Sequence, residues 1–250
     1  WDYIQGILHG DLGTSLYNNL PVMENIRNSL EPTILIMIFS ILISVVVGIP
    51  VGVISAVHRN SILDYLLMTV SVFGLSIPVF WSGIMLAYYV GTLWGVLPNM
   101  YYYPISQVGL GQAIQYVILP SVALGFQSVA SIARYTRSTM LDTLGEDYIR
   151  TARAKGLAER VVLYQHALKN AMSPVITHIG TNMASLMGGA CVIETVFGIN
   201  GMGKLAYDSL IRRDYTQVQA IILVVALVYI VINLVVDILY KVFDPRVELS

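Results

Sequence analysis

The sequence has few charged side chains. Asp, Glu, Lys and Arg make up 12% of its 250 residues, against about 25% in an average soluble domain, while hydrophobic residues make up 56%. Neither a charged residue nor a histidine occurs from Tyr65 to Ala133, a run of 69 residues. That run is long enough for two helical crossings of a bilayer. The mean hydropathy of the whole chain is +0.70. These features exclude an ordinary soluble domain and indicate a membrane protein.

Motifs of catalytic and metal sites are also missing. With Cys191 as its one cysteine, the sequence holds no internal disulfide and no cysteine-based metal site. It has no G-x-S-x-G elbow, and Gly201-Met-Gly203-Lys204 lacks the spacing and hydroxyl residue of a phosphate-binding loop. No basic patch with interleaved aromatics points to nucleic acid. The histidines are scattered over different segments: His9, His58, His166 and His178. We therefore predict no enzyme activity, no cofactor, no metal site and no nucleic-acid partner.

Five apolar stretches are each long enough to cross a hydrocarbon core of about 30 Å as a helix of about 20 residues. The predicted spans are 33–57, 66–94, 112–134, 174–197 and 216–242. Glycine and proline occur in or beside these spans, and we interpret them as kinks and close helix contacts rather than as gates. The predicted fold class is an all-α, polytopic helical membrane protein, with a membrane domain over 33–242.

The distribution of basic residues sets the orientation, because cytoplasmic loops carry an excess of Lys and Arg. Placing 58–64, 134–173 and the tail after residue 242 on one side collects nine of the fourteen basic residues, and Lys241, at the edge of the last span, makes ten. That side is predicted to be cytoplasmic, so 243–250 is a cytoplasmic tail and 1–32 is extracytoplasmic. Because five spans with an outside N-terminus would require unaided translocation of 1–32, we expect a further helix upstream of Trp1. The expected protein has six spans in the cell (inner) membrane, with both ends inside.

The predicted cytoplasmic segment 142–173 is polar but patterned. Its first apolar stripe recurs at helical spacing, at Leu141, Leu144, Tyr148 and Ala152, and Gly156 then interrupts the pattern. A second stripe follows on a helix that Ser173-Pro174 is expected to end: Leu157, Val161, Tyr164, Leu168 and Ala171. Periodicity alone leaves two interpretations open, an interfacial helix resting on the lipid bilayer and a helix that docks on a soluble subunit.

The residues of this segment form a recognisable pattern. The run is Glu146-Asp-Tyr-Ile-Arg-Thr-Ala-Arg-Ala-Lys-Gly156-Leu, continued by His166-Ala-Leu-Lys-Asn-Ala-Met-Ser-Pro174. It resembles the cytoplasmic signature loop of ATP-binding cassette (ABC) importer permeases, and more narrowly that of the dipeptide/oligopeptide/nickel permease family, although Thr151 replaces the glutamate of the broader motif. Further matches follow in order along the chain: Gly10-Asp-Leu-Gly-Thr-Ser15, Ile193-Glu-Thr-Val-Phe-Gly-Ile-Asn-Gly-Met-Gly203, Arg213-Asp-Tyr215 and Asp244-Pro-Arg246.

The resemblance implies a division of labour between subunits. In that family a short helix of the loop fits a cleft on the ATPase subunit and couples nucleotide-driven dimerisation to movement of the membrane helices. It implies a second homologous permease subunit, two ATP-binding cassette ATPase subunits and an extracytoplasmic substrate-binding protein as partners. The residues expected to couple to the ATPase are Ala152, Arg153, Ala154, Lys155, Gly156, Leu157, Glu159 and Arg160.

Polar residues within the predicted spans are candidates for the translocation path, since such residues usually face the bundle interior or water. On the fourth span these are His178, Asn182 and Glu194, and the first two share a helix face. The alternatives are hydrogen bonds between helices for His178 and Asn182, and pinning of the outer loop by Glu194. Asn233 and Asp237 of the last span are expected to be structural. The aromatic residues at the outer boundary are expected to form an interfacial belt: Trp94 and Tyr101-Tyr-Tyr103.

The functional hypothesis is a permease subunit that forms half of the path of an ATP-driven importer of dipeptides or oligopeptides. A binding protein would deliver substrate near 95–111 and 198–215, and the ATPases would dock around Gly156. One alternative is the import of nickel or a metal chelate. A different kind of alternative is a membrane scaffold or channel that is not coupled to an ATPase.

Overall fold

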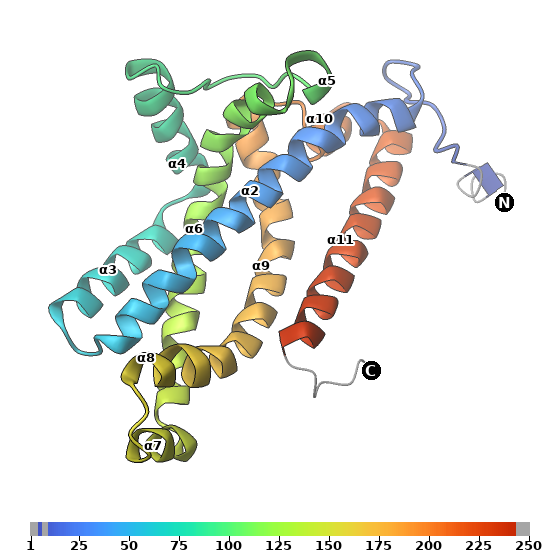
Figure 1. Cartoon of the computed structure of the whole chain (residues 1–250). Coiled ribbons are helices and arrows are strands. Elements are labelled where there is room, and N and C mark those ends of the chain that lie inside the picture. Colours follow the sequence, from blue (N-terminus) through green and yellow to red (C-terminus); the bar gives the residue numbers. More distant parts are fainter. Residues whose placement is uncertain (1–4, 7–9, 244–250) are drawn as a thin grey trace. The chain divides into compact units, whose positions relative to one another are not determined.

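The computed structural model describes residues 5–6 and 10–243, without the side chains of 184–185, 235–237 and 239–243. The described chain is helical, and its isolated β-bridge joins Thr14 and Pro21 (Figure 1). The helices and the π-helical segments η1 and η2 are α2 (Val22–Val57), α3 (Ile62–Ser76), α4 (Val79–Leu86), η1 (Ala87–Leu93), α5 (Ile105–Val108), α6 (Leu110–Leu144), α7 (Asp147–Ala154), α8 (Glu159–Val161), η2 (Val162–Leu168), α9 (Lys169–Val196), α10 (Met202–Ile211) and α11 (Tyr215–Phe243). The predicted all-α class is confirmed.

The chain divides into two compact units. Unit 1 comprises the described residues of Trp1–Phe39, Pro78–Leu124 and Ser185–Val231, and unit 2 those of Ser40–Ile77, Gly125–Ala184 and Ile232–Ser250. Helices α2, α6, α9 and α11 each contribute residues to both units. The predicted coupling segment 142–173 belongs wholly to unit 2.

Helices α2 and α6 pack closely within unit 2, because α2 presents small residues at four-residue spacing. Ser44 donates a hydrogen bond to the backbone carbonyl of Gly125, at 3.2 Å. A Cβ added at Gly48 would lie 3.0 Å from the carbonyl oxygen of Val129, and one at Gly52 only 2.5 Å from that of Ala133. Small residues in such a row let two helix backbones approach, as in membrane helix pairs. Glycine at position 52 is therefore required by the packing.

The predicted span 66–94 is not one continuous helix. Helix α3 ends at Ser76, Ile77 adopts an extended conformation with ψ 123°, and α4 begins after Pro78. The residue before a proline is driven away from the helical region, and proline lacks the N–H that would continue the helix. The side chain of Gln127 donates a 2.7 Å hydrogen bond to the carbonyl of Ile77, which satisfies that carbonyl oxygen at the break.

The described residues contain three helices that are long and apolar enough to cross a membrane: Val22–Val57, Leu110–Leu144 and Tyr215–Leu234. The broken pair Ile62–Ser76 and Val79–Leu93 makes a fourth if it counts as one span. Helix α9 is 28 residues long, and within it Leu186–Val196 is a shorter apolar stretch. Helices α2 and α6 extend beyond the apolar limits predicted for them, because their polar turns continue the same helix.

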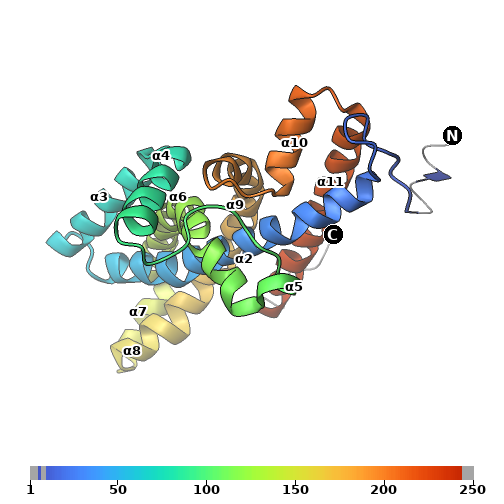
Figure 2. The same ribbon diagram turned by 90° about the horizontal axis from the view of Figure 1, so that it is seen from above.

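Unit 1 has its own apolar cluster, formed around the start of α2. Its buried members are Leu12, Val22, Ile26, Met202, Ala220 and Ile221. The segment before α2 is fixed to the turn between α10 and α11 (Figure 2), where buried Asp214 accepts hydrogen bonds from the Ser15 hydroxyl and the Leu16 N–H. Beside it, the Arg212 guanidinium lies 4.1 Å from the centre of the Tyr17 ring. The N-terminal segment is thus held by a buried carboxylate.

Candidate functional site

The turn around Gly156 has a well-defined hydrogen-bond pattern. Helix α7 ends at Ala154, and Gly156 takes a left-handed conformation with φ +77°. The Gly156 N–H donates to the carbonyl of Arg153 at 2.9 Å, and the Leu157 N–H donates to that of Ala152 at 3.4 Å. These two bonds are those of a Schellman motif, which favours glycine at the left-handed position. The predicted glycine turn is therefore present, and its cause is this helix cap.

An ion pair closes the same turn. Arg153 binds Glu159 through two contacts, Nη2–Oε1 at 2.7 Å and Nε–Oε2 at 3.2 Å. The hydrogen bond from Arg153 holds the pKa of Glu159 below its usual value. Both side chains are exposed, so the pair adds little stability. Its geometric effect is to join the end of α7 to the start of α8.

One face of the segment is buried against the ends of α2 and α6. The cluster contains Val53 and Ala56 of α2, Met140 of α6, Ile149 and Ala152 of α7, Val162 and Ala167 of η2, and Ala171 of α9. All eight side chains are buried and belong to unit 2. The segment therefore packs on membrane-helix ends of its own chain.

The predicted stripes were partly wrong. The first helix breaks at Gly145, before α7, so Ile149 is fully buried whereas Tyr148 is 42% exposed. In the second stripe Tyr164 is 59% exposed, and the buried positions are Val162 and Ala167, five residues apart. In a π-helix the hydrogen bonds join residues five apart and each turn holds more residues than in an α-helix, and η2 covers this stretch. Both errors come from changes of helical phase that the regular spacing did not reveal.

The second helix also does not end at Ser173-Pro174, as had been predicted. Pro174 lies inside α9, and α8, η2 and α9 follow one another without a break from Glu159 to Val196. Neighbouring helices and adjusted local turns can satisfy the groups that an internal proline frees in membrane helices. The predicted coupling segment therefore continues without a break into the helix that carries His178.

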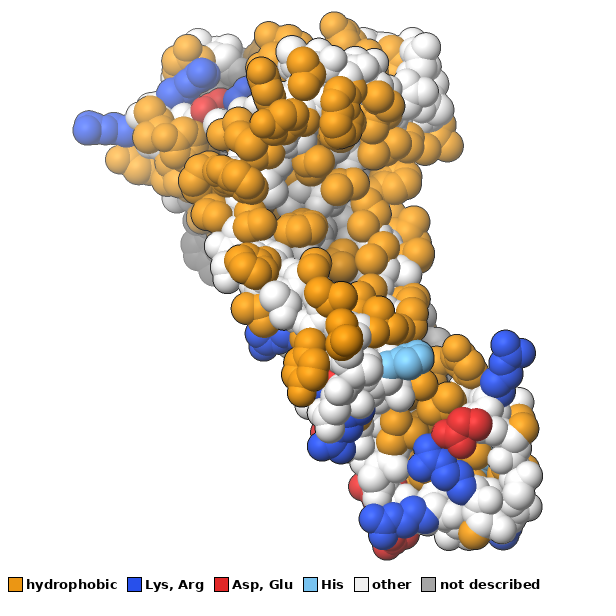
Figure 3. All heavy atoms as spheres, turned by 90° about the vertical axis from the view of Figure 1, so that its left-hand side faces the viewer, with side chains coloured by type: hydrophobic (Ala, Val, Ile, Leu, Met, Phe, Trp, Pro, Cys, Tyr) orange, Lys and Arg blue, Asp and Glu red, His pale blue; other side chains and the backbone are white. Residues whose placement is uncertain are grey.

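Most of the residues expected to couple to an ATPase lie on the solvent-exposed face of this segment, away from the buried cluster. Exposed positions are Arg153, Ala154, Lys155, Gly156, Leu157, Glu159 and Arg160, whereas Ala152 is buried in the cluster. Charged side chains gather at the lower end of the face in Figure 3, which α7 and α8 occupy in Figure 1. The turn thus presents a polar surface around the exposed Leu157.

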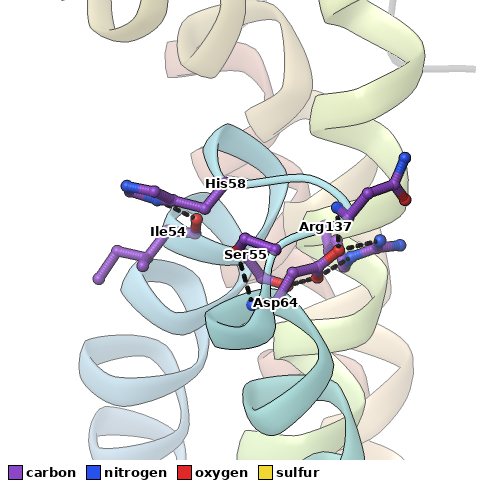
Figure 4. A network of polar contacts seen from close by, with 7 residues as sticks. Ile54, Ser55, His58, Asp64 and Arg137 are labelled. Atoms are coloured by element: carbon purple, nitrogen blue, oxygen red, sulfur yellow. Dashed lines mark hydrogen bonds and ion pairs between the residues drawn. The ribbon is translucent and has the colours of Figure 1, made fainter.

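A buried ion pair that the sequence reasoning missed lies beside this cluster. Asp64, 1% exposed, accepts hydrogen bonds from Arg137 Nε to Oδ1 and from Arg137 Nη2 to Oδ2, both at 2.7 Å (Figure 4). The Ser55 hydroxyl and the Asn60 N–H also donate to it. The pair ties the ends of α2, α3 and α6 together. The local signal was Ser61-x-x-Asp64, a helix N-cap in which the Asp64 N–H donates to the Ser61 hydroxyl.

His178 and Asn182 occupy one polar cluster. His178 Nε2 lies 2.9 Å from the Ser131 hydroxyl and 3.0 Å from the Asn182 amide nitrogen. The imidazole also stacks on Tyr135, with ring centres 4.2 Å apart. These contacts join α6 and α9 within unit 2. Both side chains keep partial exposure, so the structure combines the interhelical contacts with an open side.

Glu194 lies in unit 1, and the partners of its side chain differ from those of His178 and Asn182. Its side chain is fully buried and accepts hydrogen bonds from the Thr33 hydroxyl at 2.5 Å and the Lys204 N–H at 2.8 Å. A Cβ at Gly201 would lie 2.2 Å from the carboxylate. Glu194 thus holds the first turn of α10 through the Lys204 backbone N–H, whereas the Thr195 hydroxyl donates to its own helix, at Cys191.

The outer aromatic residues divide between exposed and anchored ones. Trp94 and Tyr101 are more than 60% exposed. Tyr102 instead donates a hydrogen bond to Glu31, and burial together with this carboxylate raises the pKa of its phenol. Asp237 lies outside the residues whose side chains are described, and Asn233 is half-buried. Among the described residues no group of three or more His, Cys, Asp or Glu side chains could hold a metal ion.

Comparison with known proteins gives consistent matches over most of the chain. Residues 48–249 match the family described as binding-protein-dependent transport system inner membrane component. Dipeptide transport system permease protein DppB of Alkalihalophilus pseudofirmus is 42% identical over 98% of this chain and 80% of its own length. DppB of Escherichia coli K12 is 41% identical over 98% and 79%, and glutathione transport system permease protein GsiC of Escherichia coli O6:H1 is 42% identical over 99% and 78%.

Solved structures agree at the level of the fold. An inward-facing structure of the MetNI methionine ABC transporter gives a TM-score of 0.72 at 18% identity, covering 88% of this chain and 97% of the matched one. An amino acid ABC transporter gives 0.57 at 16% identity, with 99% of both chains covered.

Proposed function

Because the chain belongs to the family of binding-protein-dependent transport system inner membrane components, we propose that it forms one half of the translocation path of an ATP-driven importer of dipeptides or oligopeptides. Membership makes it a multi-span, non-catalytic permease component of the inner membrane. It also implies ATPase and binding-protein partners, and we propose two ATPase subunits and a second homologous permease. The relatives named for dipeptides and for glutathione, a tripeptide, favour peptide over the nickel alternative.

The observation that carries the coupling role is the two-sided character of 142–173. Its apolar face is occupied by Val53, Ala56 and Met140 of the same chain, so it has no wide apolar face left for lipid. Its outward side is a capped turn with Arg153, Lys155, Glu159 and Arg160 exposed around Leu157. A surface of this kind suits a soluble partner. It supports docking of an ATPase subunit around Gly156, with displacements passed to α2, α6 and α9.

The proposed topology has five spans in this chain, with α9 and the broken α3–α4–η1 run each counted as one. The segments are 1–32 outside, 33–242 as the membrane domain and 243–250 as a cytoplasmic tail. Binding-protein contacts are proposed near 95–111 and 198–215. The basic residues of 134–173 support the cytoplasmic assignment of that loop.

The proposed translocation path follows the polar side of α9 in unit 2. His178 and Asn182 keep partial exposure there, and Thr177 and Thr181 are exposed beside them. Polar side chains in membrane helices usually face a bundle interior or water, which supports a wet surface along this side. Glu194 is proposed to be structural instead, since its carboxylate is buried and occupied by hydrogen bonds.

The coupling proposal is tested by site-directed crosslinking to the co-expressed ATPase in a Cys191→Ser background. Ala158→Cys places a thiol on the exposed turn, and Ala167→Cys, fully buried in the cluster, is the matched control. We expect an ATP-sensitive crosslink from position 158 and none from position 167. If position 158 gives no crosslink in a complex that still hydrolyses ATP, the docking assignment is wrong.

A further inference from the structure

Unit 2 contains a cleft of about 390 Å³ to which no role has been given so far. It is lined by Met68 of α3, Ser131, Arg134, Tyr135, Arg137 and Ser138 of α6, and His178 of α9. Its lining combines two guanidinium groups, hydroxyls, an aromatic ring and a thioether. Among the residues whose side chains are described, no carboxylate lines it. A cavity with several convergent polar groups beside apolar surface is the usual form of a small-ligand site.

The two arginines of the cleft differ in their electrostatic state. Arg137 is neutralised by the buried carboxylate of Asp64. Among the described residues no carboxylate lies within ion-pair distance of Arg134, and its side chain is exposed. Arg134 therefore supplies an uncompensated positive charge to the cleft. Its planar guanidinium presents paired N–H donors that match a carboxylate.

The imidazole is held by two polar side chains. His178 Nε2 lies within hydrogen-bond distance of the Asn182 amide nitrogen, at 3.0 Å, and of the Ser131 hydroxyl, at 2.9 Å. The stacked pair of Tyr135 and His178 then forms a flat aromatic wall, 4.2 Å between ring centres. The cleft thus has a cationic donor in Arg134, a hydroxyl in Ser138 and an aromatic wall, while the Ser131 hydroxyl is engaged with His178.

The exposed side chains beside the cleft are polar on α9, whereas on α3, around Met68, Leu66 and Val70 are exposed and apolar. Along α9 the exposed residues in this region are Thr177 and Thr181, both polar. The exposed residues of α2 in the same unit are apolar, among them Leu42, Val46 and Ile54. A surface that faces lipid tails is expected to resemble this side of α2.

We propose that this cleft binds the carboxylate of a short peptide on its way through the permease, with Arg134 as the anion-binding residue. The proposal deepens the proposed peptide transport and rests on it. The C-terminal carboxylate would accept hydrogen bonds from the Arg134 guanidinium, with the Ser138 hydroxyl nearby. The aromatic wall of Tyr135 would contact the adjoining side chain.

The test is equilibrium binding of radiolabelled alanyl-phenylalanine and its C-terminal amide to the full transporter, permeases with ATPases, in nanodiscs without binding protein. A charge-assisted pair of hydrogen bonds predicts that wild type binds the acid about tenfold more tightly than the amide. Arg134→Gln should remove this preference, and Arg134→Lys should restore part of it. Arg59→Gln, an exposed arginine outside the cleft, should keep it. Retained ATP hydrolysis confirms that each variant is folded.

Equal binding of acid and amide by wild type, or an unchanged preference in Arg134→Gln, overturns the proposal. The nanodiscs are prepared with and without phosphatidylglycerol. If the effect of Arg134→Gln appears only with that lipid and is equal for acid and amide, Arg134 binds a lipid phosphate instead. Uptake of alanyl-phenylalanine by proteoliposomes with the binding protein tests the proposed function separately. If wild type itself binds acid and amide equally, while uptake persists in wild type and in Arg134→Gln, the cleft is refuted and peptide transport still stands.

Discussion

Removing one partner of the ion pair between Asp64 and Arg137 should destabilise unit 2 strongly. Asp64→Asn leaves the Arg137 guanidinium, whose side chain is 26% exposed, without its buried carboxylate. Breaking a buried pair costs about 3–5 kcal/mol, and the remaining exposure of Arg137 puts the expected loss near the lower end, about 3 kcal/mol. For a chain of this size that corresponds to a fall in melting temperature of about 6–12 °C.

The assay is thermal unfolding of the purified transporter in detergent, performed as a double-mutant cycle. Arg137→Gln alone should cost about as much as Asp64→Asn, and the double variant should cost less than either single one, because it leaves no charge without its partner. Arg150→Gln, which breaks an exposed 3.5 Å pair with Asp147, is the control and should leave the melting temperature unchanged. If the two single losses add in the double variant, the pair is not coupled and the reasoning is refuted.

Three further substitutions test other parts of the structure by the same unfolding assay. Gly52→Ala would place a Cβ 2.5 Å from the Ala133 carbonyl and should lower the free energy of unfolding by about 3 kcal/mol through overpacking. The control is Gly188→Ala, which has open space around its Cβ and should not lower it. Equal effects of the two substitutions would contradict the close helix contact. Gly156→Ala should cost about 1 kcal/mol, because its Cβ meets no atom but the left-handed conformation is strained; an unchanged stability would argue against that conformation. Burial opposes ionisation of Asp214, but hydrogen bonds from Ser15 and nearby N–H groups outweigh it and lower its pKa. Its carboxylate therefore stabilises the fold above the unfolded pKa of about 4, and this contribution is lost as the pH falls through the lower folded pKa. Asp214→Asn should be less stable at pH 7 and lose less stability on acidification, and an acid profile identical to wild type would refute this role.

The features that composition controls could be predicted from the sequence. A bilayer requires long apolar helices, so the low charge and the apolar runs predicted the helical class. The glycine turn at 156 was also predictable, since glycine is favoured where the backbone must take a positive φ. Both features depend on residues that are neighbours in the sequence, so a single sequence shows them.

The errors arose where helical phase changes. The stripe prediction assumed regular spacing through 141–171, but the break at Gly145 and the π-helical η2 shift which side chains face the cluster. Ile149 and Val162 therefore replaced Tyr148 and Tyr164 as buried residues. A π-turn has no strong sequence signal, so its effect on the buried face could not be read from periodicity.

Contacts between residues far apart in the sequence were the second feature that the sequence did not predict. Asp64 and Arg137 are 73 residues apart, and the sequence showed them only as two charges on the predicted cytoplasmic side. The roles of Glu194 and Thr33, 161 residues apart, were equally inaccessible. Whether a polar residue in a membrane helix binds another helix or faces water depends on its neighbour across the helix contact, and a single sequence does not identify that neighbour.

The unbroken helical run from Glu159 to His178 fixes the length of this part of the chain. Each residue of an α-helix turns the next by about 100°, and each residue of the π-helical η2 by a smaller angle, so the direction in which His178 points is set in phase with the exposed turn at Glu159. Inserting or deleting one residue between them would rotate the cleft wall by about 100° relative to the docking turn, whereas a seven-residue insertion would restore the phase to within about 20°. Substitutions along 160–177 leave this phase unchanged and are therefore compatible with coupling. Single-residue insertions and deletions change the phase and are expected to disrupt coupling.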